Sequence, residues 1–412
     1  MFEDSSKAVR GPRESHAPKA PLRSVADMTQ ALAGLPYDER LAALEADPRC
    51  QTEAFCRQLL GARVLEPEGI PEEGLMQQAD LAVWCAEHLQ DGDSRSAWDL
   101  RSSAEVRAGN ARRAAGEKWS AASAFERARR YRRAGSGCPL VEAEALAFEA
   151  LLLRDRGRLA FAGRQLDRAF VLLDRGDAAG YLDQGLAAEV SAHQGWCLHH
   201  LGRYGEALAA LQRADTLIDE AANAKLAMAI CQGEVWSALQ AGDETATCEL
   251  LRQAVAVVGR LGAADTADAL RLCHAEAHLL AARGEAARAQ HSLSEVAERF
   301  FAVGAGLDGA LALFDLAALR LGGPTRTTRG ESSGERTRDL GDRILQTYRA
   351  GPVPRTAMDT LSLFRQACLN GNLTAQLARE LGRFLERVRR PSLSWWSGRG
   401  AVFEGGHAVP LD

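Results

Sequence analysis

The sequence predicts an all-α fold, a right-handed α-solenoid built from helix-turn-helix repeats. Ala, Leu, Arg and Glu dominate the composition, aromatic residues make up only 6%, and no run of β-branched residues alternates as it would in a strand. No Pro- or Gly-rich linker divides residues 25–321, and one short sequence template recurs within this stretch. Because neither helix of a hairpin can bury its apolar face alone, repeated hairpins are expected to stack around a continuous core.

The repeated template is a small residue, a glycine seven positions later, and a small or apolar residue five, nine and twelve positions beyond that glycine. The glycine suits a turn with positive φ, and the small residues suit places where two helices approach closely. In the clearest copy, Phe125 is expected to fill the gap between the two helices. The five copies are Gly109, Gly116, Ala121, Phe125, Ala128; Ala150, Gly157, Ala162, Leu166, Ala169; Gly195, Gly202, Ala207, Leu211, Ala214; Val235, Gly242, Thr247, Leu251, Ala254; and Ala277, Gly284, Ala289, Leu293, Val296.

The elements before the array are less regular. Residues 1–23 are polar and contain three prolines, so we expect a disordered tail without the apolar segment of a secretory signal. Residues 24–95 form an N-terminal helical region, either degenerate repeats or a cap, and the repeat array follows over residues 96–321. Apolar periodicity predicts four helices in the N-terminal region, at Met28–Leu35, Tyr37–Ala46, Gln51–Leu65 and Leu75–Leu89.

After the array, Leu307–Leu321 reads as the first helix of a further unit. Residues 322–336 are rich in Gly, Ser, Thr and charge and predict a flexible loop. Residues 337–390 are expected to hold C-terminal helices, the last of which caps the array with its apolar face. They lie at Thr337–Tyr348, Thr356–Cys368 and Leu373–Arg390. Residues 391–412 form an irregular tail, in which Trp395 and Trp396 either fold back as a lid or dock another molecule.

The template resembles the tetratricopeptide repeat (TPR), most openly in Gly202–Leu208 (GRYGEAL). The turn glycines are 41, 45, 40 and 42 residues apart, whereas the usual TPR unit has about 34 residues. The chain is therefore similar to long-period bacterial TPR proteins. It also resembles bacterial repeat proteins of unknown role through Asp99–Gly116, Leu307–Leu319 and Ala375–Arg387. These resemblances imply a fold and a style of binding.

In the TPR family the first helix of each hairpin lines a concave groove that binds partner proteins. Carried over by position, the resemblance implies that Asn110, Arg113 and Arg154 fix polar groups of a partner and that Trp196 and Trp236 supply apolar anchors. Two alternatives stay open: both Trp residues pack between repeats, or Asn110 bonds only to backbone or solvent. The implied groove residues are Asn110, Arg113, Leu151, Arg154, Asp155, Trp196, His199, His200, Gln232, Trp236, Gln240, His274 and His278.

Composition argues against several other functions. The net charge of −5 gives no bulk attraction to nucleic acid or an anionic membrane, and no apolar tract is long enough to span a bilayer. We expect a cytoplasmic protein whose nine cysteines are reduced core residues. The arginine-rich Glu126–Arg133 is expected to be a solvated face or a helix end, and RNA binding there is the last-ranked alternative.

Metal and catalytic functions find little support in the sequence. Cys273, His274 and His278 form one stripe on a helix, and His193, Cys197 and His200 form another, but no carboxylate triad or CxxC pair accompanies either, so no metal or cofactor is expected. Phosphate-binding and hydrolase motifs are missing, so no enzyme is expected. The sequence favours an interaction scaffold that binds a peptide segment or helix of a partner. The alternative is a regulatory sensor in which a small molecule or signal peptide changes the pitch of the repeats and so alters binding of a partner protein.

Overall fold

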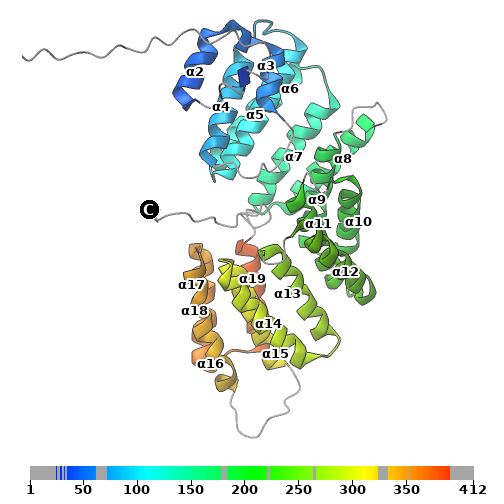
Figure 1. The fold of residues 1–412 in the computed structure, drawn as a ribbon, viewed down its shortest axis with the longest axis vertical. Coiled ribbons are helices and arrows are strands. Elements are labelled where there is room, and N and C mark those ends of the chain that lie inside the picture. Colours follow the sequence, from blue (N-terminus) through cyan, green and yellow to red (C-terminus); the bar gives the residue numbers. More distant parts are fainter. Residues whose placement is uncertain are drawn as a thin grey trace, which may run out of the picture.

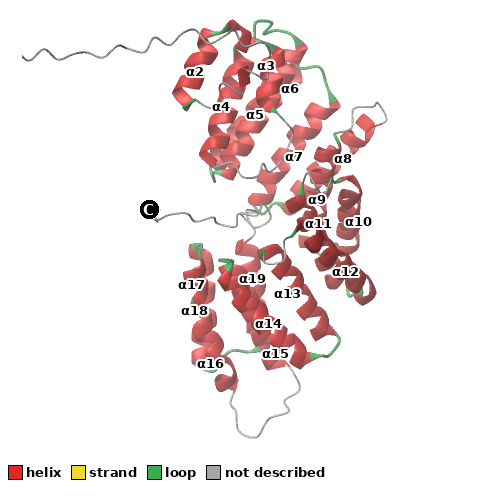
Figure 2. Ribbon diagram, viewed as in Figure 1, coloured by secondary structure: helices red, strands yellow, loops and turns green. Residues whose placement is uncertain are grey.

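Over the residues that the computed structural model describes, the regular secondary structure of the chain is entirely helical. The described residues are 35–61, 72–177, 183–219, 223–262, 266–322, 333–351 and 353–389, together with Val25, Met28, Thr29 and Leu32. Within these ranges there is no β-strand, as Figure 2 shows. The prediction of an all-α fold is confirmed.

Consecutive helices pack against each other as antiparallel hairpins. The first helices of the hairpins are α5 (Arg95–Ala114), α7 (Pro139–Asp155), α9 (Gln184–His200), α11 (Ala224–Gln240), α13 (Ala267–Ala282) and α15 (Gly306–Gly322). The second helices are α6 (Lys118–Ala134), α8 (Leu159–Asp177), α10 (Tyr204–Leu217), α12 (Glu244–Leu261) and α14 (Ala286–Ala302). Each predicted turn glycine lies directly between a first and a second helix with φ between 72° and 82°, a region that only glycine enters without strain. These glycines are Gly116, Gly157, Gly202, Gly242 and Gly284.

The small residues of the template mark the closest approaches between paired helices. A Cβ atom added to Gly109 would lie 2.9 Å from the ring of Phe125, which fills the gap between α5 and α6 as predicted. At Gly195 an added Cβ would lie 2.5 Å from Leu211 Cγ. The other small template residues of the second helices are almost fully buried, for example Ala121, Ala162 and Ala207. Side-chain size at these positions therefore sets the spacing of the hairpins.

First and second helices differ in burial. Every residue from Leu186 to Leu198 of α9 is buried, whereas the buried residues of α10 are Ala207, Ala210, Leu211 and Ala214, a single helical face. Each first helix contacts the first helices of the neighbouring hairpins as well as the second helices beside it. Figure 1 shows the helices following one another in chain order along an arc. The first helices thus form one continuous row.

The N-terminal region consists of α2 (Tyr37–Ala46), a short 3-10 helix η1 (Pro48–Gln51), α3 (Glu53–Leu60) and α4 (Glu72–Glu87). Helix α2 matches its predicted bounds. Helix α3 is shorter than the predicted Gln51–Leu65, because Thr52 caps its start through Phe55 N and Gly61 ends it at φ 62°. The buried side chains of this region, among them Leu44 and Phe55, pack with those of α4 and α5 in one apolar cluster.

The C-terminal region contains α16 (Ser333–Arg343), α17 (Gln346–Ala350), α18 (Arg355–Leu369) and α19 (Ala375–Arg389). The loop predicted over residues 322–336 is shorter in the structure, because α15 continues to Gly322 and α16 begins at Ser333. Residues 323–332 lie outside the described residues. The predicted helix Thr337–Tyr348 is divided into α16 and α17. Helix α19 packs on α15 and α18, as expected of a terminal helix.

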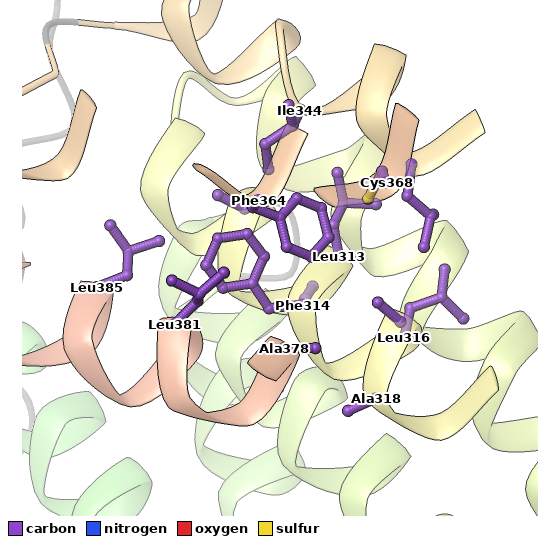
Figure 3. Packing of buried hydrophobic residues seen from close by; sticks show 14 of the residues in the cluster. Leu313, Phe314, Leu316, Ala318, Ile344, Phe364, Cys368, Ala378, Leu381 and Leu385 are labelled. Carbon is purple, nitrogen blue, oxygen red and sulfur yellow. The ribbon is translucent and has the colours of Figure 1, made fainter. Parts of the chain in front are cut away.

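The core beneath α19 brings α15 together with the two last helices of the described chain, α18 and α19. Phe314 of α15 and Phe364 of α18 lie with ring centroids 4.1 Å apart, and Leu381 and Leu385 of α19 flank them (Figure 3). All four side chains are buried. This packing fixes the rotation of α15, and hence the direction in which its polar residues point.

Some predictions fall on residues outside the described ranges, namely the tail 1–23, the tail 391–412 and the pair Trp395 and Trp396. Among the described helices, none is long and apolar enough to cross a membrane. All nine cysteines are free thiols, and six of them are buried. This agrees with their predicted use as small core residues.

Candidate functional site

A series of polar side-chain contacts joins each first helix to the next, and we call this series the polar ladder. Its partners are 36 to 42 residues apart in sequence, which is about one repeat. Because the first helices are largely buried, most of these polar groups are removed from water and need partners within the protein. The ladder is therefore the main polar feature along the row of first helices.

The first rungs of the ladder connect α5 and α7. Arg107 Nε donates to Glu144 Oε1 at 2.9 Å, and Ser103 Oγ donates to the other oxygen of the same carboxylate at 3.2 Å. In the last turn of α5, Arg113 Nη1 donates to Asp155 Oδ2 at 2.7 Å. Glu144 and Asp155 are both buried. Charge-assisted hydrogen bonds of this kind offset the cost of burying a carboxylate.

The Asp155 carboxylate also accepts from Arg154, which extends the network to α9. Arg154 Nη2 donates to Asp155 Oδ1 at 3.2 Å, and Arg154 Nη1 lies 3.1 Å from His193 Nδ1. Since a guanidinium can only donate, Nδ1 of His193 must be the acceptor. Burial and the neighbouring guanidinium hold the pKa of His193 well below its ordinary value, so the imidazole is neutral here.

In the middle of the row the rungs contain no carboxylate or guanidinium group. His199 Nδ1 lies 3.1 Å from Ser237 Oγ, which joins α9 to α11. Gln232 Nε2 donates to the backbone oxygen of Asp268 at 3.1 Å, which joins α11 to α13. Trp196 is only 4% exposed and packs in an apolar cluster with Leu211 and Ile230. Its burial favours the interpretation that Trp196 packs between repeats.

The last rungs, between α13 and α15, are again charged. Arg271 Nε donates to Asp308 Oδ1 at 2.9 Å and Arg271 Nη1 to Asp268 Oδ1 at 2.6 Å. His274 and His278, one turn apart, both direct Nε2 at Asp315 Oδ2, at 2.9 and 3.0 Å. The sequence shows no carboxylate triad or CxxC pair with this His pair, which argues against a metal site. The structure weakens that argument, because α15 brings the carboxylate of Asp315 to the two imidazoles.

Trp236 differs from Trp196 in its surroundings. Its ring meets His274 and His278 edge-on, with centroids 5.5 and 5.3 Å apart, and the residue is only partly buried. Trp236 lies in α11, so it bridges from that helix to the polar groups of α13. Of the two predicted anchors, it is the one that is partly exposed.

The structure places the predicted groove residues along the row as follows. Asn110, Arg113, Asp155, Arg154 and His193 form one continuous network, in which Asn110 Oδ1 accepts from Arg113 Nε at 2.8 Å. His199 and Gln232 bridge neighbouring helices separately, and Trp236, His274 and His278 gather beside Asp315. Leu151 is fully buried, His200 is partly buried and Gln240 is exposed. Their role in binding a partner stays a prediction.

Sequence reasoning missed several members of the ladder, which include Arg107, Glu144, Ser237, Arg271, Asp308 and Asp315. A signal for them exists in the sequence. Each ion pair between first helices joins residues one period apart, so searching for opposite charges at a spacing of 37 to 42 residues would have selected Arg107 with Glu144 and Arg271 with Asp308.

The arginine-rich segment lies in α6, a second helix. Arg127 is paired with Glu105 at 2.5 Å, and Arg129 with Glu126 and Glu149 at 3.2 Å. Arg132 and Arg133 lie in the last turn of α6, where a positive charge complements the helix dipole. The structure therefore agrees with the predicted helix end, and part of the positive charge is offset by neighbouring carboxylates.

One further ionisable group is buried in the row. Glu234 of α11 is 6% exposed, and burial, together with the negative charge of Asp215, raises its pKa to about 8. Near neutral pH this side chain is therefore mostly protonated.

The geometry defines the class of molecule: an all-α protein of consecutive hairpins whose first helices are joined by polar side chains. A comparison with models of known protein families finds no match to the sequence, and a comparison with curated proteins finds none either. The functional argument accordingly depends on this chain's own residues.

Proposed function

We propose that this protein is a TPR-type interaction protein, a right-handed α-solenoid that binds a peptide segment or helix of a partner protein along the row of first helices. The observation that carries the proposal is that the first helices α5 to α15 contact one another in chain order, and that partly exposed side chains such as those of His199, Trp236 and His278 lie along this row. Repeat proteins with such rows use them as extended binding surfaces. The five template copies, with a turn glycine between each pair of helices, support the assignment to TPR-type repeats.

Trp236 is the anchor that this proposal selects. Large aromatic side chains carry much of the binding energy in protein interfaces, provided that they can reach the partner. Trp236 is partly exposed, whereas Trp196 is almost fully buried between repeats. We therefore place the apolar contact of the partner at the α11–α13 part of the row, beside His274 and His278.

The test uses a photo-reactive amino acid in place of Trp236, in the full chain, to cross-link and identify a directly bound partner segment. The matched control carries the same amino acid in place of Trp119, which lies in the second helix α6 and is 86% exposed. The partner segment is then synthesised, and its affinity is measured for the wild type, Trp236→Ala and Trp119→Ala.

We expect cross-linking at position 236 and a loss of binding of about 2 kcal/mol or more for Trp236→Ala, as for a typical interface hot spot. Trp119→Ala should bind like the wild type. Equal cross-linking at both positions, or equal affinity of the two Ala variants, would contradict binding of the partner along the first helices. Stabilisation of the chain by a small molecule without any protein partner would instead favour a sensor.

A further inference from the structure

Three potential metal ligands from two helices converge beside Trp236. The Nε2 atoms of His274 and His278 lie 2.9 and 3.0 Å from the same oxygen, Asp315 Oδ2. One ligand atom from each residue lies within 4.8 Å of both others. Within the described part of the chain, this is the one group of three His, Cys, Asp or Glu residues with such a geometry.

The separations already resemble those between ligands of one metal ion. A transition-metal ion binds imidazole nitrogen and carboxylate oxygen at about 2.0 to 2.2 Å, so two ligands at right angles are separated by about 3 Å and two ligands of a tetrahedron by about 3.4 Å. The two observed N···O distances are close to the first of these values. Binding would therefore require only small movements of the side chains.

Proton balance makes an exchange with a metal ion possible. In the structure both Nε2 atoms face one carboxylate oxygen, so each must carry a hydrogen in order to donate to it. A divalent cation can take the place of these two hydrogens, since its bonds to two imidazole nitrogens and the carboxylate satisfy the same three groups. An imidazolium releases its Nε2 proton to solvent when the metal binds, and a neutral imidazole changes tautomer, so that its hydrogen lies on Nδ1. Each metal-bound imidazole then has Nδ1–H for an outer hydrogen bond, as metal-bound histidines usually do.

The surroundings suit a cation that keeps part of its coordination shell open. The side chain of His274 is 9% exposed, while those of His278 and Asp315 are 31% and 30% exposed, so one side of the group faces solvent. Three protein ligands with an open side leave positions for water.

The scaffold holds the ligands on rigid elements. His274 and His278 are one turn apart on α13, which places them on one face of that helix. Asp315 follows Phe314, whose ring is packed against Phe364 of α18 (Figure 3). Trp236 closes the group on the α11 side.

We propose that His274, His278 and Asp315 bind one divalent transition-metal ion, with Zn²⁺ the best match to two imidazoles and one carboxylate. The ion joins α13 to α15 and retains water on its exposed side. The inference does not depend on the proposed binding of a partner protein.

The experiment measures binding of Zn²⁺ and of Co²⁺, each alone, to the full chain after treatment with a chelator. We expect one ion per chain, a rise in the thermal unfolding midpoint, and visible Co²⁺ absorption bands of nitrogen and oxygen coordination. His278→Gln and Asp315→Asn should each weaken binding at least about tenfold, since each removes one of three protein ligands. Two variants are used so that the loss of a ligand can be read even if one of them folds poorly.

The matched control is His199→Gln, which removes a histidine that joins two other first helices and lies outside the proposed site. It should bind both ions like the wild type. The proposal is overturned if the wild type binds neither ion, if His278→Gln and Asp315→Asn bind as tightly as His199→Gln, or if the Co²⁺ complex shows the near-ultraviolet bands of thiolate ligands, which would assign the ion to cysteines.

Discussion

The substitution Gly195→Ala tests whether the template residues set the distance between paired helices. Two effects oppose each other. Ala is favoured over Gly inside a helix by about 1 kcal/mol, but here an added Cβ would lie 2.5 Å from Leu211 Cγ and 3.1 Å from the backbone oxygen of Ala207. Neither atom is the free end of a flexible side chain, so α9 and α10 must separate. Overpacking of this kind costs about 1 to 3 kcal/mol, so after the gain from helix propensity we expect a net loss of up to about 2 kcal/mol.

The assay is chemical unfolding of the wild type and the variant, followed by circular dichroism. The matched control is Gly163→Ala in α8, where an added Cβ meets nothing within 4 Å. That variant should gain up to about 1 kcal/mol from helix propensity alone. Leu211→Ala should relieve the crowding, so Gly195→Ala should cost much less when both changes are present. If Gly195→Ala stabilised the protein as much as Gly163→Ala, the close-packing argument would be refuted.

Two further predictions concern buried charge. Asp155→Asn keeps the shape of the side chain but leaves the buried guanidiniums of Arg113 and Arg154 without their shared counter-charge, so it should lower the free energy of unfolding by about 3 kcal/mol; a loss under about 1 kcal/mol in urea unfolding would contradict this. Glu234→Gln mimics the protonated carboxyl, whose pKa is raised from 4.5 to about 8 by burial and by Asp215. Because the folded state holds this proton more tightly than the unfolded state, the wild type should lose stability relative to the variant as pH rises from about 4.5 to about 8, at up to about 1.4 kcal/mol per pH unit. When the free energies of unfolding of the two proteins are plotted against pH, they should diverge across this range and keep a constant difference above it. A constant difference throughout would be inconsistent with a buried, protonated Glu234.

The helical hairpins could be predicted from the sequence because their signals are local. Gly116 and Gly157 lie in turns with positive φ, a conformation that favours glycine, and Gly109 and Phe125 are complementary in size across one hairpin. Both features recur at a fixed spacing, so a single chain shows them several times.

The state of Trp196 could not be predicted in the same way. A Cβ added to Gly233 would lie 3.0 Å from the Trp196 ring, so the space for this indole depends on a glycine of the next first helix. Trp236 has the same position in the template one repeat later, yet it is partly exposed. Burial was decided by the neighbouring helix.

The candidate site was predicted only in part for a related reason. The sequence places His274 and His278 on one face of a helix, but it does not fix how α15 is rotated against that face. The rotation depends on Phe314 packing under α18 and α19, which are far along the chain. Only after that packing is known does Asp315 become the shared partner of both histidines.

The polar ladder has a consequence for how the chain could be rearranged. Its rungs differ chemically, since Arg107 meets Glu144, Arg154 meets His193, and Arg271 meets Asp308. If two hairpins exchanged places, buried charges would face unsuitable neighbours and lose several kcal/mol. The repeats share one apolar template, but the polar side chains at each interface between hairpins match those of the natural neighbour. We therefore expect a chain with the same hairpins in another order to be less stable.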